Sequence, residues 1–295
     1  MKGKISTALL TLLFLIGFGI LAYPTISNQW NTYRQSKLIG NYENTLSDMT
    51  PEDFTAQWER AKNFNSTITS NNIYADVFGA DDSENMTGTE YWQVLNVSQD
   101  GIMGYLSIPK INIKLAIYHG TNDAVIQTGV GHMNGTSLPV GGEGTHSVLA
   151  AHRGLPSAKL FTDIDRMKLG DMFYIHILDE TLAYKVDDIQ DMVDKDDTKT
   201  LEADLAIQEG RDLVTLFTCT PYGVNSHRLL VRGTRVPYNG EEEETASIAN
   251  SMVQSIQNYY MFYLALGLAV TILLIQLMRI RVKRKDVGKS AGGDS

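Results

Sequence analysis

Cysteine is almost absent from this chain, which has only Cys219 in 295 residues. A single cysteine excludes an intramolecular disulfide framework and any zinc site built from several cysteines. Basic residues are outnumbered as well, with 25 Lys and Arg against 34 Asp and Glu, for a net charge of −9. Because nucleic-acid binding needs a basic face, this balance argues against nucleic acid as the main partner. Disorder along the whole chain is excluded by the hydrophobic content of 43%.

Charged residues are missing from two apolar runs, one toward each end of the sequence. Residues 5–22 carry no charge, and residues 260–278 contain only two strongly polar side chains. Both runs are close to the ~20 residues that cross a bilayer as a helix. We expect the first run, within residues 1–22, to be an uncleaved signal anchor, because no clear A-x-A site follows it. A cleaved signal peptide is the alternative.

The charges beside the two runs predict the membrane topology. Lys2 and Lys4 precede the first run, and six basic residues against two acids follow the second, in residues 279–295. Basic flanks stay in the cytoplasm. We therefore expect a two-pass protein of the cell membrane, with both termini cytoplasmic and the segment between the spans extracellular.

Between the runs the sequence pattern changes twice. Residues 23–72 are expected to be helical, with a helix start at Thr50-Pro51-Glu52-Asp53, where a hydroxyl cap precedes a proline and two acids. Residues 63–89 are rich in Asn, Ser, Asp and Gly, which is typical of an exposed loop, and residues 73–89 are the expected lid within it. Residues 90–238 alternate short β-rich runs with turn residues, and an acidic linker of residues 239–259 follows. This pattern predicts a mainly β domain, either a barrel or a sandwich. Examples of the expected strands are Met103–Ile108, Lys114–Tyr118, His146–Ala151, Met172–Leu178, Ala183–Ile189, Leu213–Thr218 and Leu229–Val236.

The single cysteine ends one apolar run, and an arginine begins the next. If the two runs pair as a hairpin, Cys219 and Arg228 meet at one rim despite nine positions of separation. A thiolate is the reactive form of cysteine, and a nearby cation favours it. The arginine could also donate to a developing oxyanion. The alternatives are a small buried hydrophobe for the cysteine and a surface position for the arginine.

A cysteine nucleophile needs a proton partner, usually histidine, and the chain has six histidines. His119 and His176 are expected to be structural, and strand alternation turns His227 away from the cysteine side. His152 follows an apolar run and precedes a loop, which is where catalytic groups tend to lie. Spacing along the chain does not show which histidine is near Cys219, so the residues alone leave this choice open.

Two motifs resemble the active-site signature of the sortases. Residues 215–219 read Thr-Leu-Phe-Thr-Cys, and Arg228 begins Arg-Leu-Leu-Val-Arg-Gly. Upstream, residues 142–154 read Gly-Glu-Gly-Thr-His-Ser-Val-Leu-Ala-Ala-His-Arg-Gly. The likeness covers roughly residues 101–237 and is greatest to class C, the pilin-polymerising sortases, which share a double membrane anchor and an N-terminal lid. It implies an eight-stranded sortase β barrel.

The resemblance also implies a reaction. Cys219 would attack the Thr–Gly carbonyl of an LPXTG-type sorting signal, His152 would donate and accept the proton, and Arg228 would stabilise the oxyanion or align the substrate. The acyl group would pass to a lysine amine of the next pilin subunit, with no metal or cofactor. Two alternatives stay open: a sortase that anchors proteins to a peptidoglycan amine, and a non-catalytic membrane-tethered assembly module.

The loop of residues 73–89 departs from the class C pattern. It reads Ala75-Asp76-Val77-Phe78-Gly79, with valine where the family commonly has proline. The resemblance implies a lid in which Asp76 pairs with Arg228 and Phe78 covers Cys219. The alternative is an ordinary acidic loop with one aromatic residue, since loss of the proline frees the backbone.

Overall fold

The computed structural model describes residues 2–69, 77–78, 88–240, 242 and seven residues between 265 and 276. The chain forms two compact units, one of residues 1–22 and 247–295 and the other of residues 23–246. In the described part, one helix is long and apolar enough to cross a membrane, over Leu12–Ser47. The predicted second span, residues 260–278, lies mostly outside the described residues.

Two long helices come first in the chain. Helix α1 covers Lys2–Ser47, and α2 covers Pro51–Thr67. The helix start predicted at Thr50 is confirmed, because its hydroxyl accepts from the Asp53 amide at 3.2 Å while the Asp53 carboxylate accepts from the Thr50 amide at 2.9 Å. Within the second unit, Tyr42 of α1 donates its hydroxyl to the Met103 carbonyl at 2.9 Å, which fastens the helix to the barrel. Three short helices follow: α3 (Glu90–Gln93), α4 (Asp123–Ile126) and α5 (Thr198–Leu205).

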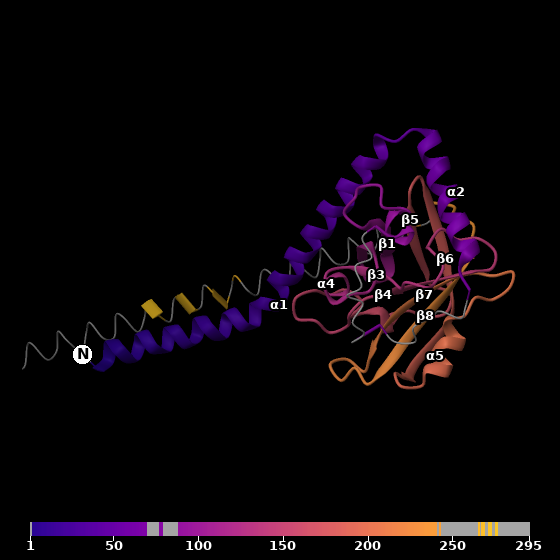
Figure 1. Ribbon diagram of the computed structural model, residues 1–295. Coiled ribbons are helices and arrows are strands. Elements are labelled where there is room, and N and C mark those ends of the chain that lie inside the picture. The colour runs from indigo at the N-terminus through magenta and orange to yellow at the C-terminus, as the bar shows by residue number, and fades with distance from the viewer. Residues whose placement is uncertain are drawn as a thin grey trace, which may run out of the picture. The chain divides into compact units, whose positions relative to one another are not determined.

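Eight strands close into a mixed barrel in the order β1-β2-β3-β4-β7-β8-β6-β5. Most of these strands are labelled in Figure 1. The predicted barrel is therefore confirmed. Most pairs are antiparallel, but β2 with β3 and β4 with β7 are parallel. The strands are β1 (Ile102–Ile108), β2 (Ile113–His119), β3 (Val130–His132), β4 (Thr145–Ala150), β5 (Met172–Ile177), β6 (Glu180–Asp194), β7 (Asp212–Thr220) and β8 (His227–Val236).

The barrel interior is a packed apolar core. Alternate residues of each strand point inward, and Leu149 of β4, Leu216 of β7 and Val231 of β8 all belong to the main buried cluster. Their neighbours Val148, Phe217 and Leu230 instead form a second cluster on the outer face of the same three strands. At Gly104, where β1 has an irregular register, a side chain would lie 2.2 Å from the His176 carbonyl oxygen, so only glycine fits.

Candidate active site

Cys219 and Arg228 are directly paired across the β7–β8 hairpin. The register predicted from the sequence is therefore correct, and both residues are almost fully buried. The Arg228 guanidinium donates through Nη1 to the carbonyls of Asn225 at 3.0 Å and His227 at 2.9 Å. These two bonds hold the guanidinium at the end of β8 that pairs with Cys219. A positive charge near a cysteine favours the thiolate.

His152 reaches the same rim through a different strand pairing. Strand β4 runs parallel to β7 with Ala150 opposite Phe217, and both His152 and Cys219 lie two residues beyond that pair. Hydrogen bonds fix the His152 backbone, because its amide donates to the Ile126 carbonyl at 3.4 Å and its carbonyl accepts from the Phe161 amide at 3.1 Å. A long-range parallel pairing of this kind cannot be deduced from spacing, which is why the residues alone left the histidine undecided.

The imidazole of His152 is half-buried. Burial lowers its pKa below the ordinary 6.5, and the negative charge of Asp123 opposes part of that shift. The neutral ring is therefore favoured at neutral pH, so that it can take up a proton as a base and return it as an acid.

Phe78 packs against this site. Its ring centroid lies 5.3 Å from that of His152 and 5.7 Å from that of Phe217, and the Arg228 guanidinium carbon lies 5.2 Å from its centre. Val77 is buried beside it in the outer cluster. The cover of Cys219 predicted for Phe78 stays a prediction, and Asp76 and the rest of the predicted lid, except Val77, Phe78, Gly88 and Thr89, fall outside the described residues.

The outer cluster is a second buried core, beside the rim that carries Cys219. Helix α5 covers one side of it with Leu201 and Leu205, beside β7 and β8 (Figure 1). The cluster consists of Val77, Met133, Val148, Ala150, Leu201, Leu205, Phe217 and Leu230, with Phe78 and Val193 packed against it.

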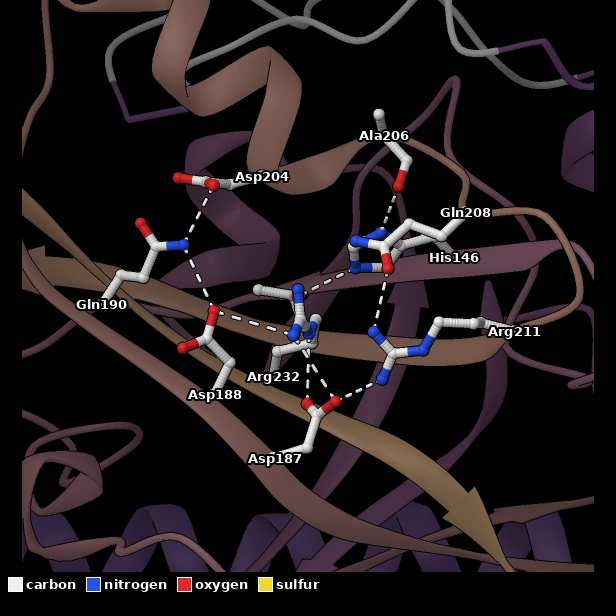
Figure 2. A network of polar contacts seen from close by, with 10 residues as sticks. His146, Asp187, Asp188, Gln190, Asp204, Ala206, Gln208, Arg211 and Arg232 are labelled. Carbon is white, nitrogen blue, oxygen red and sulfur yellow. Dashed lines mark hydrogen bonds and ion pairs between the residues drawn. The ribbon is translucent and has the colours of Figure 1, made fainter.

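A polar network, which the sequence did not predict, holds the α5 segment in place (Figure 2). Asp187 accepts hydrogen bonds from Arg211 and from Arg232, whose Nε donates at 3.1 Å. Burial disfavours the Asp187 carboxylate, but the bonds from the two arginines outweigh burial and lower its pKa. Gln190 bridges the network to Asp204 in α5 at 2.9 Å. The adjacent acids at 187 and 188 in a long β-rich run were the only signal in the sequence.

His146, at the start of β4, belongs to the same network. Its Nδ1 lies 2.9 Å from the Ala206 carbonyl and its Nε2 lies 2.8 Å from the Thr215 hydroxyl. Burial lowers its pKa to about 4, with the charges of Arg232 and Arg211 acting in the same direction. His119 has a similar arrangement with the backbone carbonyls of Gly101 and Val94, which agrees with its expected structural role.

Comparison with known proteins agrees with this geometry. A family model described as "Sortase domain" matches residues 106–236. The chain is 41% identical to the solved sortase C of Streptococcus pneumoniae, a structure described for catalysis and pilin substrate specificity, covering 68% of this chain and 97% of that one with a TM-score of 0.58. It is 44% identical to sortase C1 of Streptococcus agalactiae, covering 69% and 100% with a TM-score of 0.59. Among curated proteins, it is 27% identical to sortase A of Bacillus anthracis over 49% of this chain and 65% of that protein, so it spans slightly less than two thirds of that relative. The chain belongs to the sortase family.

Proposed function

We propose that this protein is a cysteine transpeptidase of the class C type, which joins pilin subunits through isopeptide bonds. The observation that carries the proposal is the convergence of Cys219, His152 and Arg228 at one barrel rim, from paired strands β7 and β8 and the end of β4. The identity of about 40% to sortase C enzymes supports the pilin class of substrate.

The first half of the reaction forms an acyl-enzyme. His152, neutral at rest, takes the proton of the Cys219 thiol. The resulting thiolate attacks the carbonyl carbon of the Thr–Gly bond in an LPXTG-type signal, and a carbon–sulfur bond forms. Arg228 donates to the oxyanion that develops on the carbonyl oxygen. Protonated His152 gives its proton to the glycine nitrogen, so the carbon–nitrogen bond breaks and a thioester remains.

The second half transfers the acyl group to an amine. The ε-amine of a pilin lysine attacks the thioester carbon, neutral His152 takes up the amine's proton, and the carbon–sulfur bond breaks. An isopeptide bond forms, and Cys219 leaves as a thiolate beside the protonated imidazole. Because water also attacks thioesters, the cleft must exclude water until the amine arrives. No metal or cofactor enters either half.

We propose further that Phe78 and Asp76 form a lid over the resting site, within residues 73–89. The Phe78 ring packs against His152 and Arg228, so a bound sorting signal and this ring would compete for the same surface. Asp76 would pair with Arg228 and withhold the guanidinium from substrate. The catalytic domain would be extracellular, held by two membrane spans with both termini in the cytoplasm.

The acceptor is the part of the proposal that most needs a test. Full-length protein in detergent, mixed with purified pilin subunits, should produce a covalent ladder on a denaturing gel. Cys219→Ala is the matched control and should produce none. Transfer of a sorting-signal peptide to a peptidoglycan amine, without any ladder, would favour the wall-anchoring alternative. Absence of both products would favour a non-catalytic assembly module.

The lid has a separate test based on thiol labelling. Phe78→Ala combined with Asp76→Ala should raise the rate of Cys219 alkylation by iodoacetamide, since it uncovers the thiol. Phe78→Leu retains apolar cover and should raise the rate less. Cys219→Ala controls for labelling elsewhere. An alkylation rate that stays at the wild-type value in the double variant would contradict the lid.

A further inference from the structure

We propose that Arg153 is a positioning residue, which sets the separation of His152 from Cys219 by tying together the two chain segments that carry them. The inference rests on the proposed function and extends it to a residue outside the reacting groups. Arg153 directly follows His152, and its guanidinium bonds to Thr220, which directly follows Cys219.

Three hydrogen bonds fix the guanidinium. Nη1 donates to the Thr220 hydroxyl at 3.2 Å, Nη2 donates to the Asp165 carboxylate at 2.5 Å, and Nε donates to the Thr162 carbonyl at 3.3 Å. The Arg153 side chain is only 7% exposed, so a charge at this place depends on its partners. Asp165 supplies the compensating charge from the 3-10 helix Ile164–Arg166.

The bonds join segments that are far apart in the sequence. Thr220 ends β7, whereas Thr162 and Asp165 belong to the connection from β4 to β5. Thr162 also accepts from the Gly154 amide at 3.2 Å, which folds this connection back onto the residues after His152. Arg153 therefore bridges the His152 loop and the end of the Cys219 strand.

The bridge lies on the side of the strands away from the reacting groups. Consecutive side chains of a strand point to opposite faces, so Thr220 faces away from Cys219. Leu149 and Ala151, which alternate with Arg153 along the chain, belong to the inner core, whereas Val148 and Ala150, which alternate with His152, belong to the outer cluster. The bridge thus lies on the inner side of these strands, and His152 and Cys219 lie on the outer side.

Arginine suits this role for geometric reasons. Its planar fork directs separate donors to the three acceptors, whereas the lysine ammonium is a single point on a flexible stem. A displacement of about 1 Å between reacting groups can lower a rate by ~10²-fold. Loss of the guanidinium should therefore change the separation of the Cys219 thiol and the His152 imidazole, in addition to lowering the stability of the fold.

The test compares the Arg153→Lys and Thr220→Val variants of the full-length protein in a Phe78→Ala background, which uncovers the thiol. Arg166→Lys is the matched control, since that arginine lies in the 3-10 helix that carries Asp165 but is 66% exposed and pairs with Asp163 instead. Three quantities are measured: the pH dependence of Cys219 alkylation, the rate of acyl-enzyme formation with a sorting-signal peptide, and the melting temperature.

If Arg153 positions the site, Arg153→Lys should slow acylation by about 10-fold or more. It should also move the midpoint of the pH dependence of alkylation toward ~8.5, the pKa of an ordinary thiol. Thr220→Val should change both in the same direction, and the double variant should be no worse than Arg153→Lys alone, because both remove one bridge. Arg166→Lys should change neither. If Arg153→Lys does not fold, Thr220→Val alone provides the same readouts.

A merely structural arginine gives a different result. Its variants would lower the melting temperature while the folded protein retained the parent's alkylation profile and acylation rate, and this would overturn the inference alone. An ordinary alkylation profile and no acyl-enzyme in the Phe78→Ala parent would overturn the proposed function itself, and the inference with it.

Discussion

The two ends of strand β4 carry histidines in contrasting environments. His146 near the start has both ring nitrogens close to acceptors or hydroxyls of the protein, within a network of partly buried charges. His152, just past the other end, has its backbone fixed, but its ring lies against Phe78 and is half-buried. The first ring is held by groups that belong to the barrel, and the second is covered by a loop residue that a substrate could replace. We therefore expect proton transfer at His152, whose ring is covered by Phe78, and not at His146.

The largest expected effect comes from replacing each of the two histidines separately. His152→Asn should lower the acylation rate by ~10²–10⁴-fold, the usual size of general acid–base catalysis, with little change in melting temperature. His146→Asn should instead lower the free energy of unfolding by about 1–3 kcal/mol, because it disturbs buried hydrogen bonds. Peptide acylation monitored by mass spectrometry and thermal unfolding measure the two effects. Equal losses of activity in the two variants would contradict the assignment of a catalytic role to His152 and a structural role to His146.

A second substitution tests whether the His146 region is held by charge. Asp187→Asn removes the carboxylate shared by Arg211 and Arg232 and should lower the free energy of unfolding by about 2–3 kcal/mol. Urea denaturation measures the change. Asp196→Asn is the control, because that carboxylate is 78% exposed and its pair with Lys195 should contribute little. A similar small effect in both variants would mean that the network does not stabilise the α5 segment.

The smallest effect is the contribution of a single buried histidine to stability per pH unit. Burial lowers the pKa of His146 and of His132 to about 4, so between about pH 4 and 6.5 the unfolded chain binds protons that the folded protein does not. The free energy of unfolding should therefore fall as the pH decreases through this window, by up to ~1.4 kcal/mol per pH unit for each histidine. His146→Asn should reduce the slope by one histidine's share, and an unchanged slope would contradict the assigned environment.

Local pairing was predictable from the sequence, and long-range pairing was not. The Cys219–Arg228 contact follows from a hairpin whose strands are adjacent in the chain, so alternation and turn residues suffice. The place of His152 depends on the parallel pairing of β4 with β7, more than sixty residues apart, and only the family resemblance indicated it. Strand β3 was missed because three residues are too few for a periodic pattern.

The buried polar groups were the least predictable part of the site. Arg153 stands next to His152 in the sequence, but its partners Thr162, Asp165 and Thr220 come from two other segments. No spacing rule joins such residues, since tertiary folding alone brings them together. The same holds for Asp187, whose two arginines lie 24 and 45 positions away.

The central claim is that Cys219 forms a thioester with a sorting signal while His152 and Arg228 assist it. The most direct measurement is the intact mass of the full-length protein after incubation with an LPXTG-type peptide. The account predicts an added mass equal to the peptide portion ending at threonine, absent in Cys219→Ala and slower to form in His152→Ala and Arg228→Ala. An unmodified wild-type protein, or an adduct that persists without Cys219, would contradict it.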